Sequence, residues 1–169
     1  RLSRSIVKSP SFNQRNVGSW GKYFEEPKPE ANKIDELKTR LRSLLTLAFR
    51  RPIQDKTFQK YFSYARQQID QGLGIGDVMK EVLSAVLASP RFLYLYDQGG
   101  KESAKPESNQ NLDLASRLSF FLWGSLPDEE LLQLAEQGIL VEDERLSQQV
   151  DRMLANDKLK RFCDSFPTQ

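Results

Sequence analysis

The 169 residues of this sequence include no histidine and only one cysteine, Cys163. Without histidine, the chain has no imidazole base, no Ser-His-Asp or Cys-His arrangement, and none of the commonest transition-metal ligand. A single thiol cannot close an internal disulfide, and covalent haem attachment needs two thiols and an axial imidazole in a C-x-x-C-H motif. We therefore expect no haem-attachment, zinc or histidine-based catalytic site, and no cofactor, within this chain.

Long apolar runs and an excess of one charge are also missing. No stretch of about 18 apolar residues is present, so no transmembrane segment is predicted. The 25 basic against 23 acidic residues give a net charge of +2, which does not indicate nucleic acid or an anionic membrane as partner. The apolar content of 38% is that of a globular chain and excludes wholesale disorder. The chain begins with Arg1 and no apolar signal core follows, which we interpret as processing or truncation.

Apolar spacing predicts helices over most of the chain. Residues 1–30 have no sustained period and are interrupted by glycine and proline, so we expect an irregular N-terminal arm. In residues 31–96, apolar residues recur at spacings of three and four, which predicts three helices. Pro52 ends the first, Asp55 caps the second before Gly72 ends it, and Asp77 caps the third.

A polar stretch, residues 97–111, separates this segment from a second helical domain at 112–169. We interpret it as a linker loop, because it holds two glycines and a proline and has almost no apolar residue. The next helix carries an apolar face and ends at Gly124; its members are Leu114, Ala115, Leu118, Phe121 and Leu122. Residues 125–130 begin another helix, with Pro127 in its first turn and the acids Asp128, Glu129 and Glu130 complementing its dipole, and Gly138 ends it. Two more helices follow, the last with Cys163 on its apolar stripe.

The fold class predicted is therefore all-α, with six or seven helices in two packed halves and the arm in front of them. Each half is a piece of roughly 60 residues that buries proportionately little surface alone. We expect the halves to share a core through the aromatic clusters at 92–96 and 120–123.

Several residues are candidates for chemistry, and each also has a structural explanation. Arg50 and Arg51 could hold a phosphate or carboxylate, but cations near a helix end complement its dipole without any ligand. The acids at 128–130 could bind a hard cation, yet the spaced ligands of a calcium loop are missing and acids are common in a first helical turn. Cys163 lies on an apolar stripe, where thiols are usually small buried hydrophobes. The structural interpretation is favoured in all three cases.

The aromatic clusters could line a pocket for a ligand or partner, or form a core. Tyr94, Tyr96 and Trp123 offer flat apolar faces with polar tips, and Arg91 and Arg117 lie beside them in sequence. Core packing is the favoured explanation. We predict that Trp123 is buried and that its indole N–H reaches a carbonyl near a helix end.

Consecutive motifs in the chain resemble one family. They are A-F-R-R-P from Ala48, A-S-P-R-F-L-Y from Ala88, L-A-S-R-L-S-F-F-L-W from Leu114 and S-L-P-D-E-E-L-L from Ser125. Together they resemble signatures of large planctomycete-type proteins that link c-type cytochrome domains to helical domains of unknown function. The resemblance covers about residues 36–169, so it leaves the role of the arm open, and it implies a chain cut within its last domain.

The resemblance implies a non-catalytic helical scaffold or docking module of an exported or periplasmic, cytochrome-linked redox protein. Haem c would then be held by a neighbouring domain, and the partners would be other domains of the same polypeptide or another protein. Two alternatives stay open: part of a carbohydrate-active enzyme domain using residues such as Asp128 and Trp123, and a free-standing adaptor. The first would require two carboxylates roughly 5 to 10 Å apart across a cleft.

Overall fold

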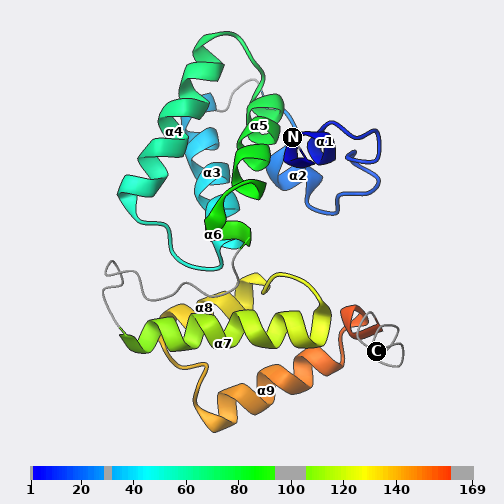
Figure 1. Cartoon of the computed structure of the whole chain (residues 1–169), viewed down its shortest axis with the longest axis vertical. Helices are drawn as coiled ribbons and strands as arrows, with labels where there is room; N and C mark the ends of the chain where they lie inside the picture. The colour runs from blue at the N-terminus through cyan, green and yellow to red at the C-terminus, as the bar shows by residue number, and fades with distance from the viewer. Residues whose placement is uncertain (1, 29–31, 94–105, 161–169) are drawn as a thin grey trace. The chain divides into compact units, whose positions relative to one another are not determined.

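The described part of the computed structural model, residues 2–28, 32–93 and 106–160, is helical and contains no strand. It forms two compact units: Arg1–Phe49 with Ile53–Tyr94, and Arg50–Pro52 with Leu95–Gln169. The first is called unit 1 and the second unit 2, and Figure 1 shows the helices of each. None of the helices described is long and apolar enough to span a bilayer.

Nine α-helices lie within the described residues, which corrects the six or seven expected, although the all-α class is confirmed. The additional ones are short: α1 (Leu2–Val7), α2 (Trp20–Tyr23) and α6 (Pro90–Leu93) have six, four and four residues. Helices of one turn or so are too short to show a 3.6-residue period in sequence. The first two lie in the stretch predicted to be irregular.

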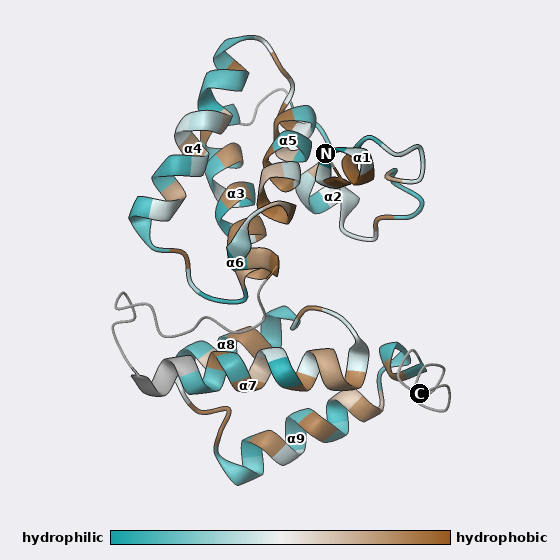
Figure 2. Ribbon diagram, in the orientation of Figure 1, coloured by the Kyte–Doolittle hydropathy of each residue, from teal (hydrophilic) through white to brown (hydrophobic). Residues whose placement is uncertain are grey.

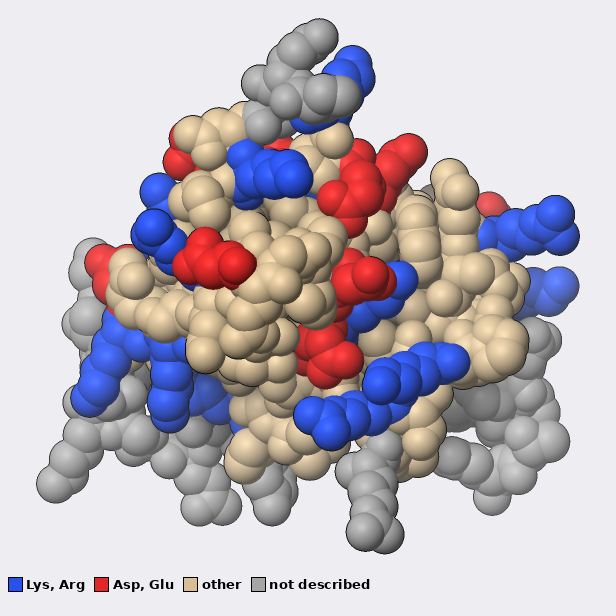
Figure 3. All heavy atoms as spheres, turned by 90° about the horizontal axis from the view of Figure 1, so that it is seen from above, with Lys and Arg blue, Asp and Glu red and all other residues tan. Residues whose placement is uncertain are grey.

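Unit 1 is built on α3 (Lys33–Phe49), α4 (Asp55–Asp70) and α5 (Ile75–Leu87), which pack against one another. α5 is apolar over most of its length, whereas α4 carries many polar residues (Figure 2). Their inner faces and the arm contribute one cluster of buried residues: Tyr23, Phe24, Leu37, Leu41, Leu44, Leu45, Ala48, Phe49, Ile53, Phe58, Phe62, Ala65, Ile75, Val78, Met79, Val82 and Val86. On the face seen in Figure 3, basic and acidic side chains are interspersed.

The arm packs closely on unit 1. The ring centroid of Phe24 lies 5.2 Å from that of Phe12 and 5.3 Å from that of Trp20. The guanidinium of the buried Arg40 donates to the Glu25 carbonyl oxygen, and α1 lies against α5. The aromatic residues of the arm thus pack on the core of unit 1.

The arm also supplies the cap of α5, which corrects the prediction that Asp77 does so. α5 begins at Ile75, and the Glu26 carboxylate accepts hydrogen bonds from the backbone N–H of Ile75 (3.3 Å) and of Gly76 (2.9 Å). A carboxylate in this place satisfies N–H groups that have no partner within the helix. Asp77 lies in the first turn, and Asp55 is likewise the first residue of its helix instead of its cap.

Gly76 provides a test of this packing, because a Cβ there would overlap the carbonyl oxygen of Phe24. Gly76→Ala should destabilise the chain by about 1 to 3 kcal/mol, the usual range for overpacking. Urea denaturation followed by circular dichroism measures the effect. Gly18→Ala is the matched control, since a Cβ at Gly18 meets no atom within 4 Å. Equal stability of the two variants would contradict the close approach of the arm to α5.

Unit 2 contains α7 (Pro106–Trp123), α8 (Glu129–Gln137), α9 (Asp143–Leu154) and a short 3₁₀ helix at Asp157–Leu159. α7 begins inside the stretch 97–111 that was predicted as a linker loop, since proline is well suited to a first helical turn. α8 begins at Glu129 with Asp128 as its cap, so Pro127 precedes the helix instead of lying in its first turn. Gly138 ends it at a φ of 77°, as predicted. Of the predicted last helix, residues 161–169 lie outside the described part.

The buried face of α7 differs from the predicted one. Phe121 is 63% exposed, and Leu114 and Leu118 are only partly buried. The face turned inward holds small and polar residues as well as apolar ones: Asn111, Leu112, Ala115, Ser116, Ser119, Leu122 and Trp123. Ala115 and Leu122 of the predicted face are buried, but Phe121 is not, because both sides of this helix carry apolar residues and periodicity alone does not choose between them. A core shared by the two halves stays a prediction.

Candidate functional site

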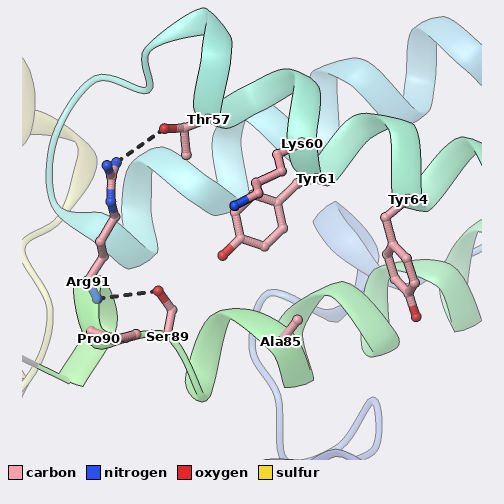
Figure 4. Close-up of a pocket in the computed structure, with 8 residues that line it drawn as sticks. All are labelled: Thr57, Lys60, Tyr61, Tyr64, Ala85, Ser89, Pro90 and Arg91. Carbon is pink, nitrogen blue, oxygen red and sulfur yellow. Dashed lines mark hydrogen bonds between the residues drawn. The ribbon is translucent and has the colours of Figure 1, made fainter.

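A groove on unit 1, between α4 and the segment from α5 to α6, is the best candidate for a binding site (Figure 4). Its volume is about 560 Å³, and five of its eight lining residues are exposed. The lining residues are Thr57, Lys60, Tyr61, Tyr64, Ala85, Ser89, Pro90 and Arg91. All of them belong to unit 1.

One side of the groove is a face of α4. Thr57, Lys60, Tyr61 and Tyr64 follow the spacing i, i+3, i+4 and i+7, which places them along one side of a helix. The Tyr61 ring packs 6.1 Å from that of Phe49, so its position is fixed by the core. Tyr64 is 39% exposed.

The other side is positioned by the corner between α5 and α6. Pro90 is the first residue of α6, a position that suits its fixed φ. The Ser89 hydroxyl accepts a hydrogen bond from the Arg91 backbone N–H at 3.3 Å. The Arg91 guanidinium then reaches from α6 to α4 and donates to the Thr57 hydroxyl oxygen at 3.2 Å (Figure 4). This bond holds the guanidinium at one end of the groove.

The charged residues that line the groove are both basic, Lys60 and Arg91. The hydroxyl groups of two tyrosines, a threonine and a serine add further hydrogen-bonding atoms. Such a set can bind an anion beside an aromatic surface. With no carboxylate in the lining, it does not form the carboxylate pair that glycoside hydrolysis uses.

Those of the other predicted site residues that the structure describes do not line this groove. Tyr94 and Tyr96 lie outside the described residues, and Arg117 is exposed on α7. Arg51 pairs with Asp113 at 3.9 Å, and its side chain is 26% exposed. Of the seven candidates, the structure places Arg91 alone in the groove.

Arg50 follows α3 with a φ of 57°, which makes it the only non-glycine residue with positive φ in the described part. This left-handed conformation costs an L-residue roughly 1 kcal/mol and commonly ends helices when the residue is glycine. Arg50 is also buried, with 5% of its surface exposed. Burial, together with the charge of Arg51, lowers the pKa of its guanidinium.

Trp123 is fully buried in unit 2, as predicted. Its indole N–H donates to the Met153 carbonyl oxygen at 3.0 Å, near the end of α9. The Lys158 ammonium lies 4.4 Å from the ring centroid. Trp123 is therefore a structural residue that cannot stack on a sugar.

Asp128, like Trp123, has a structural role. Its carboxylate accepts from the Leu131 N–H at 3.0 Å and forms a forked pair with Arg152, at 2.6 and 3.1 Å. Burial acts to raise the pKa of Asp128, but the bonds from Arg152 and Leu131 and the charges of Arg152 and Lys158 outweigh it, so this pKa is lowered. The hydrogen bond to Asp128 raises the pKa of Arg152. An acid held ionised in this way is not poised to protonate a leaving group.

The acids at 128–130 thus begin a helix, as the favoured interpretation of the sequence had it. In the described ranges, no group of three or more His, Cys, Asp or Glu side chains could hold a metal ion. Cys163 lies outside those ranges.

Sequence reasoning missed the α4 side of the groove. None of Thr57, Lys60, Tyr61 and Tyr64 was among the candidate residues. The available signal was their common helical face, which carries two tyrosines and a lysine. What completes the groove is Arg91, 34 residues from Thr57, and no local pattern predicts that contact.

Fold and groove together define an all-α chain of two helical units with a basic, tyrosine-lined groove on the first. Residues 36–97 match the family model described as PSD5, a protein of unknown function (DUF1595). Residues 110–169 match the model described as PSD4, a protein of unknown function (DUF1592). These two domains are typical of planctomycete cytochrome-c-associated proteins. No curated protein and no solved structure shows significant similarity to the chain.

Proposed function

We propose that this chain is a non-catalytic helical docking module of a larger, exported protein that also carries c-type cytochrome domains. The observation that carries the proposal is the pair of consecutive domain matches, at 36–97 and 110–169, to domain types that are typical of planctomycete cytochrome-c-associated proteins. The haem would belong to a neighbouring domain, because the chain itself has one cysteine and no histidine.

The chemistry of the described residues supports docking over catalysis. Asp128 and Arg152 neutralise each other and join the start of α8 to α9. The buried Trp123 also joins α7 to α9, through the hydrogen bond from its indole N–H to the Met153 carbonyl oxygen. The groove on unit 1 presents hydrogen-bond donors and tyrosine rings, which are groups enriched in binding surfaces.

The first test is the complete natural polypeptide. We expect a C-x-x-C-H domain in the same coding sequence, and haem staining on a denaturing gel at the band that an antibody against residues 1–169 recognises. The chain expressed alone should show no Soret band after denaturation, which is the matched control. A complete polypeptide without a C-x-x-C-H motif would overturn the proposal and favour the free-standing adaptor.

The second test is physical association. We expect the separately expressed cytochrome domain of that polypeptide to bind the chain with a measurable Kd in isothermal titration calorimetry. Binding should weaken as ionic strength rises if charged groups contribute. No heat of binding between domains that are both folded would contradict a docking role.

A further inference from the structure

We propose that the groove between α4 and α6 binds an acidic, extended peptide segment of the docking partner. The proposal deepens the docking role proposed above and rests on it. It depends on three features of the groove: its charge, its exposure to solvent and its tyrosines.

The charge of the groove selects an anion. Lys60 lies on α4 and Arg91 on α6, so one basic group comes from each side. Arg91 donates to the Thr57 hydroxyl, and a guanidinium, with its five N–H donors, can take part in several hydrogen bonds at once. A carboxylate is planar and matches the fork of such a guanidinium.

The shape of the groove favours a peptide over a small molecule. Sites for small ligands enclose most of the ligand surface, whereas Lys60, Tyr64 and Arg91 are exposed. The face of α4 from Thr57 to Tyr64 extends about 10 Å at 1.5 Å per residue. An extended chain covers that distance with about three residues.

The two tyrosines supply an aromatic contact surface beside the two charged groups. Tyr61 is positioned by Phe49, and Tyr64 lies one turn further along α4. Both extend from α4 toward α5 in Figure 4. Tyrosine gives a large contact area with little loss of side-chain entropy, and its hydroxyl can bond a peptide carbonyl. Acidic side chains would therefore meet Lys60 and Arg91 while the peptide backbone lies along the two rings.

The proposal is tested with acetylated hexaglutamate carrying a C-terminal fluorophore, and with hexaglutamine as the neutral probe. Fluorescence anisotropy with the whole chain should show saturable binding of hexaglutamate that weakens as salt is added. Arg91→Gln and Lys60→Gln should each raise the Kd by about tenfold, the scale of a charge-assisted hydrogen bond. Arg66→Gln is the matched control: Arg66 is exposed on α4, pairs with Asp70 and does not line the groove.

Three results would overturn the proposal: hexaglutamine binding as tightly as hexaglutamate, an equal effect of all three substitutions, or no saturable binding. Inorganic phosphate that binds with the same dependence on Arg91 while hexaglutamate does not would identify a small-anion site instead. Thermal unfolding of Lys60→Gln and Arg66→Gln should match the unsubstituted chain, since both residues are exposed. Arg91→Gln should lower the midpoint only slightly, because the bond to Thr57 that it removes is exposed. These outcomes are independent of whether the complete polypeptide contains a C-x-x-C-H domain.

Discussion

Replacing Trp123 with alanine should destabilise the chain by about 3 to 5 kcal/mol, the range for deleting a large buried aromatic. The side chain is 0% exposed, and the substitution also removes the hydrogen bond from its indole N–H to the Met153 carbonyl oxygen. Because domains are only marginally stable, unit 2 could lose its fold altogether. Urea denaturation followed by circular dichroism at 222 nm measures the loss.

Phe121→Ala is the matched control for this prediction. Phe121 lies on the same helix, two residues before Trp123, but is 63% exposed, so its loss should cost less than about 1 kcal/mol. Trp123→Phe separates the two contributions of Trp123, because it retains an aromatic ring and removes the indole N–H. Similar effects of Trp123→Ala and Phe121→Ala would show that the corner after α7 does not depend on the buried ring.

The second large loss of stability is expected when Asp128 is replaced. Asp128→Ala should cost about 2 to 3 kcal/mol, because it removes the cap of α8 and leaves the partly buried Arg152 without its closest carboxylate. Denaturation by urea at neutral pH measures this loss as well. Asp143→Asn, in the exposed first turn of α9, should change stability by less than about 1 kcal/mol.

The Asp128 contribution should depend on pH in a defined direction. The folded-state pKa of Asp128 lies below its ordinary value of 3.8, so the folded state binds the proton less readily than the unfolded state. The stabilisation is therefore present above the unfolded pKa and is lost as the pH falls through the folded pKa. The stability difference between the chain and Asp128→Asn should shrink as acid is added below pH 3.8. A difference that stays constant from neutral pH into acid would contradict the ion pair with Arg152.

Much of the fold could be predicted, because α3, α4 and α8 carry long periodic patterns with recognisable ends. Asp128 and Gly138, for example, bound α8 as their residue types suggested. Interactions between distant residues could not be predicted. The carboxylate of Glu26 caps a helix about 50 residues away, and the local pattern therefore pointed to Asp77.

The groove could not be predicted from the sequence for the same reason. Arg91 was selected because of neighbouring aromatic residues, yet its observed partner is Thr57 on another helix. Trp123 was assigned correctly, since an aromatic next to a helix-ending glycine has a local explanation. Phe121 was not, because helical spacing cannot decide which of two apolar faces is buried.

The attachment of the arm to α5 has a consequence for how this domain is delimited. The sequence match to the first family begins at residue 36, but Phe24, Glu25 and Glu26 bind residues within it or pack on its core. The segment that matches the family model is thus shorter than the segment that forms the folded unit. A fragment starting at residue 36 would leave the first turn of α5 uncapped and expose apolar surface that the arm covers. Comparisons among relatives should accordingly look for a carboxylate upstream of the matched segment wherever the Gly-Ile-Gly start of α5 is found.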